Sequence, residues 1–134
     1  FLSSQTIRNI ICFLNSIINT ISIPDYAPGT KFYIPNVRRY FIVEDVCGDG
    51  ALPQNGPCHT GYPAGTTAWV DMWIDGQSGT ETAVHNCAAF LTDTNGVAHT
   101  IIQNPADNYV VAPGPIFQNG ACTQQFGNTP TVTP

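Results

Sequence analysis

Charged residues are scarce in this chain of 134 residues, of which only 10% are charged and only four are basic. The basic residues Arg8, Lys31, Arg38 and Arg39 form no stripe that could neutralise a phosphate backbone, and the formal net charge is -5. Nucleic-acid binding depends mainly on contacts between basic side chains and phosphates. We therefore expect no nucleic-acid partner, whereas an uncharged polysaccharide or a cationic ligand is compatible with this charge.

An uninterrupted apolar segment is also lacking. The stretch from Ile7 to Ile23 is largely apolar, but Arg8 and several Asn, Ser and Thr residues interrupt it. Because a membrane-spanning helix needs about 20 predominantly apolar residues, we expect no membrane partner. The chain as written opens at Phe1 without the basic segment that begins a secretory signal peptide, which is typical of a processed form.

The common motifs of metal sites and of nucleophilic hydrolases are absent. His59, His85 and His99 occur in no HxH, HExxH or HxxxH spacing, and such spacings are what bring two histidines to one zinc ion. The chain has no GxSxG motif either, in which the nucleophilic serine of many hydrolases lies. We therefore expect no metal site, no cofactor and no nucleophilic serine. Metal binding by Asp45, Asp49, Asp71 and Asp75 is an alternative that stays open.

Five cysteines are present, and none of their spacings gives a CxxC pair. They are Cys12, Cys47, Cys58, Cys87 and Cys122. So many cysteines in a short chain are typical of an oxidising compartment, so we expect a secreted, extracellular protein with two disulfides of open connectivity. The odd cysteine is then either a free thiol or is linked to a second chain or to a fragment removed by processing.

The chain length fits a single domain, residues 1–134. Apolar residues recur at three- and four-residue spacing from Ile7 to Ile21 and predict an amphipathic N-terminal helix within residues 1–23, capped by Ser3 or Ser4. We expect the β core in residues 24–118. Residues 119–134 lack periodicity and predict an irregular tail.

Alternation and turn residues predict the elements of the core. The predicted strands are Lys31–Ile34, Arg39–Val46, Thr67–Ile74, Ala98–Ile102 and Tyr109–Ala112. Residues 81–91 have apolar residues at helical spacing and predict one short helix. Residues 48–66 are rich in Gly and Pro and predict a long surface loop of the kind that often serves binding.

The predicted strand 67–74 carries the main candidate site. Its two-residue alternation places Trp69, Asp71 and Trp73 together on one face. Indole rings can stack on sugar rings, and an apolar wall raises the pKa of a carboxyl group so that it can protonate a leaving oxygen near neutral pH. Alternatively, both tryptophans are core residues of a strand buried on two sides, and Asp71 is an ordinary hydrogen-bonded acid.

Asp45 is the second candidate carboxylate. It shares a face with Phe41 and Val43 in the predicted strand and precedes the loop at residues 48–66. A carboxylate there could act as a base or raise the pKa of the Asp71 carboxyl by like-charge proximity. Spacing along the chain does not define how close the two carboxylates come.

The segments PGTKFYI, YFIVEDVCGDG and WVDMWIDG resemble, in this order, the core of the double-psi β-barrel families. In that pattern a Gly-Thr strand is followed by a strand that ends in Asp and, after a loop, by a VD or FD strand. Residues 23–76 are most similar to the three-aspartate domain of the lytic transglycosylase A family, and more distantly to family 45 glycoside hydrolases, expansins and barwin-like proteins. The resemblance implies a mainly β fold, a six-stranded double-psi β-barrel with an N-terminal helix and one short additional helix.

The resemblance also implies roles for particular residues. Asp71 corresponds to the proton donor of the cellulases and expansins of this fold, and Asp45 to the acid that ends the central strand. We expect a secreted enzyme that cleaves a cell-wall β-glycan such as peptidoglycan, with Asp71 as general acid, Asp45 as its partner, and Trp69, Trp73 and Tyr62 as the substrate-binding residues.

Two other function classes stay open at this point. The barrel strand that bears a second carboxylate in family 45 cellulases has no match in this chain, which favours a non-catalytic carbohydrate-binding or defence protein of the expansin or barwin kind. A protease inhibitor is a further alternative, based on the loop around Cys58.

Overall fold

The computed structural model of this chain describes residues 7–14, 26–27, 29–43, 68–76, 78–91 and 99–134. The elements are β1 (Ile7–Leu14), β2 (Lys31–Ile34), β3 (Arg39–Ile42), β4 (Ala68–Ile74), α2 (Glu81–Leu91), β5 (Ile102–Gln103), β6 (Phe117–Gln118) and β7 (Ala121–Cys122). The expectation of a mainly β chain with one short helix is therefore confirmed for the described residues.

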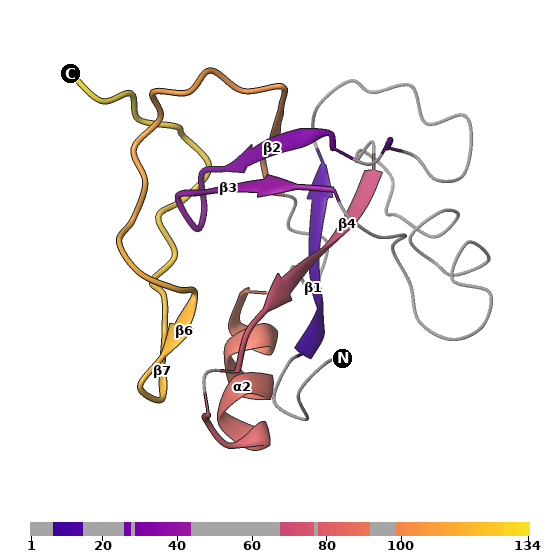
Figure 1. Cartoon of the computed structure of the whole chain (residues 1–134), viewed down its shortest axis with the longest axis vertical. Coiled ribbons are helices and arrows are strands. Elements are labelled where there is room, and N and C mark those ends of the chain that lie inside the picture. The colour runs from indigo at the N-terminus through magenta and orange to yellow at the C-terminus, as the bar shows by residue number, and fades with distance from the viewer. Residues whose placement is uncertain (1–6, 15–25, 28, 44–67, 77, 92–98) are drawn as a thin grey trace.

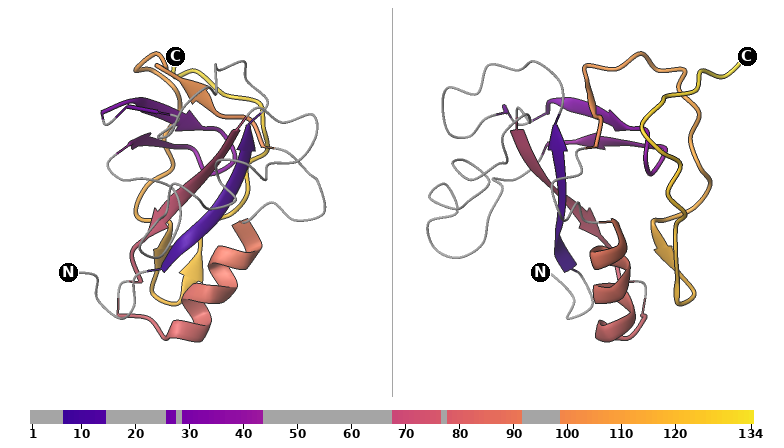
Figure 2. Two further views of the ribbon diagram at one scale, coloured as in Figure 1. Left: turned by 90° about the vertical axis from the view of Figure 1, so that its right-hand side faces the viewer. Right: turned by 180° about the vertical axis from the view of Figure 1, so that it is seen from behind.

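The described strands pair into three small antiparallel sheets, β1–β4, β3–β2–β5 and β6–β7, without closing into a barrel. We call the first of these the β1–β4 ribbon. Figure 1 shows the β2–β3 hairpin crossing one end of this ribbon, while α2 lies beside the other end. The two views in Figure 2 show the same arrangement from the side and from behind.

The N-terminal helix predicted within residues 1–23 is wrong over the part that the structure describes. Residues Ile7–Leu14 form β1, which is antiparallel to β4. A β-bulge shifts the register between Arg8 and Ile10, so Ile7 and Ile10 pair with Ile74 and Met72, on the same face of the ribbon. The bulge thus gives a strand the three-residue apolar spacing of a helix. The predicted cap at Ser3 or Ser4 and residues 15–23 lie outside the described residues.

The β2–β3 hairpin has the predicted first strand and the predicted turn. β2 covers Lys31–Ile34, and β3 covers Arg39–Ile42. The strand predicted over residues 39–46 is therefore shorter, since Val43 lies outside it. Residues 44–46 lie outside the described residues. Arg38 closes the turn at a φ of 49°, in the left-handed region. Antiparallel pairing of Phe32 with Phe41 and of Tyr33 with Tyr40 fixes the register.

The strands predicted after the helix are shorter than expected. The segment predicted at 98–102 contributes β5, Ile102–Gln103, which pairs with β2 at Phe32 and Tyr33. In the segment predicted at 109–112, the strand-like pairing is a single β-bridge between Tyr109 and Val132. Each segment is held by only a few hydrogen bonds to a neighbouring strand. The alternation of apolar and polar residues in the sequence does not show how many residues of a strand are paired.

The helix α2 has the predicted bounds, Glu81–Leu91. Thr80 caps its N-terminus, since its Oγ1 accepts a hydrogen bond from the Ala83 N–H at 3.1 Å. Its buried side chains recur at three- and four-residue spacing and are Val84, Cys87, Ala88 and Leu91. Just before the helix, Gly79 is required by close packing, because a Cβ there would lie 2.5 Å from the Phe117 ring.

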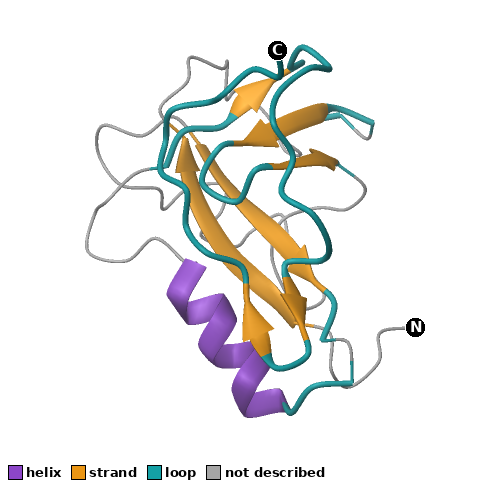
Figure 3. Ribbon diagram, turned by 90° about the vertical axis from the view of Figure 1, so that its left-hand side faces the viewer, coloured by secondary structure: helices purple, strands orange, loops and turns teal. Residues whose placement is uncertain are grey.

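One hydrophobic core joins the helix, the ribbon and the hairpin. Figure 3 shows how these elements are arranged. Its buried members are Tyr26, Phe32, Ile34, Val37, Met72, Ile74, Val84, Cys87, Ala88, Leu91, Ile101 and Phe117. The helix α2 approaches the ribbon chiefly at β1, and its buried side chains share one core with Met72 and Ile74 of β4. Burial of these side chains provides most of the driving force for folding.

The predicted irregular tail, residues 119–134, contains β7 and the bridge residue Val132, and otherwise has no regular secondary structure. It is nevertheless fixed to the hairpin turn by Asn36, whose side chain is buried. The Asn36 carbonyl and Oδ1 accept hydrogen bonds from the N–H groups of Phe126 and Gly127 at 2.9 and 3.0 Å. Its Nδ2 donates to Gln125 Oε1 at 3.2 Å.

A disulfide between Cys87 and Cys122 joins α2 to β7, with 35 residues of sequence separation. One of the two predicted disulfides is thereby confirmed. Cys12 lies on β1, at the register position opposite Val70. Cys47 and Cys58 lie outside the described residues, so the second disulfide stays a prediction.

Replacing both Cys87 and Cys122 with serine is expected to lower the free energy of unfolding by about 3–4 kcal/mol, because the bond closes a long loop. Urea unfolding of the variant and the wild-type protein measures the difference. Peptide mapping without reduction should recover the Cys87 peptide linked to the Cys122 peptide. An unchanged unfolding free energy, or a different linkage, would contradict the assignment.

Asn36→Ala is expected to lower the free energy of unfolding by about 2 kcal/mol, because two buried hydrogen bonds of its side chain are lost. Asn108→Ala is the matched control, since it removes an exposed amide and keeps the main-chain carbonyl that Thr133 uses. Chemical unfolding should separate the two variants. Equal stability of both would mean that Asn36 does not hold the C-terminal segment.

Candidate functional site

The predicted strand at residues 67–74 is confirmed as β4, and its alternation is confirmed for the core face. Met72 and Ile74 are 3% and 1% exposed, and Val70 packs against the same core. Because side chains alternate along a strand, the intervening positions 69, 71 and 73 occupy the opposite face of the ribbon. Trp69, Asp71 and Trp73 are therefore at three successive positions of one face, as predicted.

The pairing with β1 adds three further residues to this face. In the register Arg8 is opposite Trp73, Ile11 opposite Asp71 and Phe13 opposite Trp69. Directly opposed residues of an antiparallel pair lie on the same face, with Cβ atoms about 4.5–5.5 Å apart. We call these six positions the Trp–Asp face: Arg8, Ile11, Phe13, Trp69, Asp71 and Trp73.

Sequence reasoning missed the β1 contribution because Ile7–Leu14 was expected to be helical. The signal that could have found it is the content of β-branched residues, since Ile7, Ile10 and Ile11 favour a strand over a helix. The bulge next to Arg8 hid this signal, because it breaks the two-residue period by which a strand is normally detected.

The other predicted site residues, Asp45 and Tyr62, lie outside the described residues. Phe41 and Val43, which were expected to share a face with Asp45, are partly buried against the hydrophobic core. The approach of Asp45 to Asp71 and the role of Tyr62 in substrate binding stay predictions.

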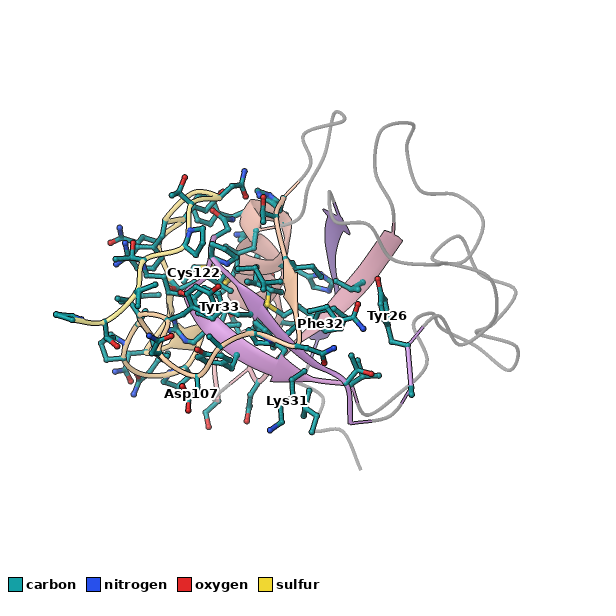
Figure 4. All side chains as sticks on the ribbon, turned by 90° about the horizontal axis from the view of Figure 1, so that it is seen from above. Tyr26, Lys31, Phe32, Tyr33, Asp107 and Cys122 are labelled. Carbon is teal, nitrogen blue, oxygen red and sulfur yellow. A yellow bond between two sulfur atoms is a disulfide. The ribbon has the colours of Figure 1, made fainter. Side chains whose placement is uncertain are left out.

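Three tyrosines form a separate cluster around Tyr33, which alternates with Phe32 and Ile34 along β2. Figure 4 labels Tyr33 and Phe32 on this strand. Tyr33 and Tyr109 stack with ring centroids 4.7 Å apart, and Tyr40 is 4.9 Å from Tyr33. The Tyr33 and Tyr40 hydroxyls donate to the main-chain carbonyls of Val110 and Ala106. These hydroxyls hold the C-terminal segment on the hairpin, which is a structural role.

The arginines of the hairpin are also committed to the fold. The Arg39 guanidinium donates hydrogen bonds to the main-chain carbonyls of Gly114 at 3.1 Å and Pro115 at 3.3 Å, and its burial lowers the pKa of this group. The Arg38 guanidinium lies 4.3 Å from the centre of the Phe126 ring, a cation–π contact. Neither arginine is placed as a ligand for a substrate.

Within the ranges that the structure describes, no group of three or more His, Cys, Asp and Glu side chains could hold a metal ion. In the same ranges no helix has the length and apolar character needed to cross a membrane. On the Trp–Asp face, one acidic position stands between two tryptophan positions along a single strand.

The described elements are small antiparallel sheets and one short helix, which a disulfide joins to β7. The chain belongs to the family of the DDB_G0273701 N-terminal domain, whose model matches residues 19–123. No curated protein and no solved structure matches the chain. The matched segment includes β4 and all the predicted site residues, whereas β1 precedes it.

Tyr33→Phe is expected to make stability less sensitive to alkaline pH. Burial raises the pKa of the Tyr33 hydroxyl above its ordinary value near 10, so the unfolded state releases this proton at a lower pH than the folded state. Stability therefore falls as pH rises from the ordinary pKa through the raised folded-state pKa. The urea concentration at the midpoint of unfolding, determined at about pH 9 and about pH 11, measures the loss of stability in the variant and in the wild-type protein.

At neutral pH the same variant should lose about 1 kcal/mol, because the hydrogen bond to the Val110 carbonyl is removed. An identical alkaline loss of stability in the variant and the wild-type protein would show that Tyr33 does not carry this pH dependence.

Proposed function

We propose that this chain is a secreted enzyme that cleaves a cell-wall β-glycan such as peptidoglycan, with Asp71 as the general acid. The observation that supports the proposal is the placement of Trp69, Asp71 and Trp73 at successive positions of one face of β4, opposite the face on which Met72 and Ile74 are buried. Burial of Met72 and Ile74 fixes the register of the strand, so a one-residue slip that would turn Asp71 into the core is disfavoured.

The geometry of an extended strand is suited to a linear ligand. Trp69 and Trp73 are four residues apart, about 13 Å along β4, with Asp71 midway between them. A glycan lying along the strand would stack sugar rings on either indole and bring a glycosidic oxygen to the Asp71 carboxyl. On β1, the apolar residues Ile11 and Phe13 are opposite Asp71 and Trp69 in the register.

A single carboxyl group is sufficient for lytic cleavage. Asp71 donates its proton to the leaving glycosidic oxygen as the bond to the anomeric carbon breaks. An internal hydroxyl of the same sugar then attacks that carbon and returns a proton to the Asp71 carboxylate, which yields an anhydro sugar. In a hydrolytic variant of the mechanism, Asp45 would activate water as the base.

Other parts of the proposal concern the compartment and the fold. The Cys87–Cys122 disulfide supports a secreted, extracellular protein, because such bonds persist in oxidising compartments. The order of β2, β3 and β4 along the chain follows the pattern of the double-psi β-barrel families and supports a six-stranded barrel of that kind. We also propose that the odd cysteine is linked to a second chain or to a fragment removed by processing.

A non-catalytic carbohydrate-binding or defence protein is the second candidate. Among the described residues, the next acid along the strand is Asp75, about 13 Å from Asp71 in an extended chain. Paired carboxylates of glycosidases lie about 5–9.5 Å apart. This spacing disfavours Asp75 as the partner of Asp71 in hydrolysis.

Asp71→Asn is expected to reduce the turnover of a cell-wall glycan by about 10²–10⁴-fold, because an amide cannot donate the proton. The measurement is the release of reducing ends and of anhydro sugars from a panel of insoluble β-glycans that includes peptidoglycan. Asp107→Asn, which changes an exposed acid in the C-terminal segment, is the matched control and should keep full activity.

Binding to the same glycans separates the two candidates. Trp69→Ala and Trp73→Ala should each weaken binding about tenfold through lost stacking, whereas Phe90→Ala, which removes an exposed aromatic ring from α2, should not. Binding without any product would identify the non-catalytic protein. Full activity of Asp71→Asn and Asp45→Asn would end the catalytic proposal, and unchanged binding by both tryptophan variants would end the role of the Trp–Asp face.

A further inference from the structure

The C-terminal residues lie along a segment that the β2–β3 hairpin holds. In this segment the Tyr109 N–H donates a hydrogen bond to the Tyr40 hydroxyl at 3.0 Å, and Tyr109 also forms the antiparallel β-bridge with Val132. Figure 1 shows the C-terminal end beyond the turn of the hairpin, away from the β1–β4 ribbon. We call residues 130–134 the C-terminal edge.

Hydrogen bonds fix which main-chain groups of the C-terminal edge point outward. The Thr131 carbonyl accepts a hydrogen bond from the Val110 N–H at 2.7 Å, and the Thr133 N–H donates to the Asn108 carbonyl at 2.8 Å. Along a strand of an antiparallel pair, the main-chain groups of successive residues point to opposite sides. The N–H and C=O of Val132 therefore point away from the paired segment, and this residue is 52% exposed.

Proline occupies both neighbouring positions of the same outward side. Positions 130 and 134 are two residues before and two residues after Val132, so their main-chain groups face the same way. Pro130 and Pro134 have no N–H, and a ring carbon replaces the donor hydrogen. Prolines within sheets are confined mainly to edges of this kind. The outward side of the C-terminal edge thus offers one N–H, at Val132, between two positions that cannot donate.

Charge, another means by which proteins protect an exposed edge, is lacking here. From residue 108 to residue 134 the sequence has no Asp, Glu, Lys, Arg or His. The β-branched residues Thr131, Val132 and Thr133 favour an extended, paired conformation, and Val111 and Val132 are exposed apolar residues. An uncharged segment with an open edge is prone to pair with another chain.

We infer that Pro130 and Pro134 prevent a second copy of this chain from pairing with the C-terminal edge. Two copies would meet antiparallel about a two-fold axis, with Val132 of one copy opposite Val132 of the other. This central pair could exchange both of its hydrogen bonds. The next hydrogen-bonded pairs on either side would join position 130 of one copy to position 134 of the other. Neither proline has a donor for these pairs, so both flanking pairs are lost.

Replacing both prolines with threonine tests this inference. Pro130→Thr combined with Pro134→Thr restores the missing donors. We expect the double variant to form a dimer about a hundredfold tighter than any dimer of the wild-type protein, because both flanking pairs gain their hydrogen bonds. Sedimentation equilibrium over a range of protein concentrations measures the dissociation constants.

Pro113→Thr combined with Pro115→Thr is the matched control. It makes the same replacement at two other exposed prolines and keeps the main-chain carbonyls that Arg39 binds. This control should associate no more than the wild-type protein. Pro130→Thr alone restores one donor in each flanking pair, so it should give an intermediate dissociation constant, and it replaces the double variant if that variant does not fold.

Hydrogen exchange of single amides, followed by NMR, locates the contact. In the wild-type protein the Val132 N–H should exchange without protection, whereas the Val110 and Thr133 N–H groups should be protected by their hydrogen bonds. In the double variant the Val132 N–H should become protected as the protein concentration rises.

Several results would overturn the inference. One is a double variant, or Pro130→Thr in its place, that associates no more than the wild-type protein. Another is a control variant that associates as strongly as the double variant. Protection of the Val132 N–H in the wild-type protein would mean that the edge is already paired. Association of the double variant without protection of this N–H would place the contact elsewhere on the surface.

Discussion

The antiparallel pairing of β1 with β4 is the interaction on which the rest of the structure depends. It satisfies the backbone hydrogen bonds of the longest strands that the structure describes, and it gives the resulting ribbon two faces of different character. One face places Met72 and Ile74 against α2 and the hairpin, in the common core. The other face is then necessarily the one that carries Trp69, Asp71 and Trp73, because residues alternate along a strand.

The C-terminal segment shows how a chain with little regular structure still becomes ordered. Asn36 binds residues 125–127, Arg39 binds the carbonyls of residues 113–115, and the tyrosine cluster binds the segment at Ala106 and Val110. The Cys87–Cys122 disulfide adds a covalent link to α2. These polar side chains therefore form hydrogen bonds with main-chain groups and are not free to bind a ligand. Buried polar groups generally need such partners.

The proposed glycan-binding role concerns the Trp–Asp face, since the tyrosine cluster and the hairpin arginines have structural roles. Trp69, Asp71 and Trp73 stand at alternate positions of an extended strand, an arrangement compatible with a linear sugar ligand, and the register places Arg8 of β1 opposite Trp73.

The sequence by itself determined the elements whose signals are local. The bounds of β2 and α2, the turn at residues 35–38 and the alternation of β4 follow from side-chain periodicity, capping and turn residues, which act within a few positions.

The sequence also indicated disulfide bonding, but it could not choose the partners. Only the tertiary structure decided that Cys87 bonds Cys122, because that choice depends on the packing of α2 against β7. Only the tertiary structure decided that Ile7–Leu14 is a strand. The apolar residues of this segment recur at helical spacing because of the bulge, but pairing with β4 stabilises the strand instead of a helix. The placement of Arg8 opposite Trp73 was decided in the same way, by a register between strands that lie far apart in the sequence.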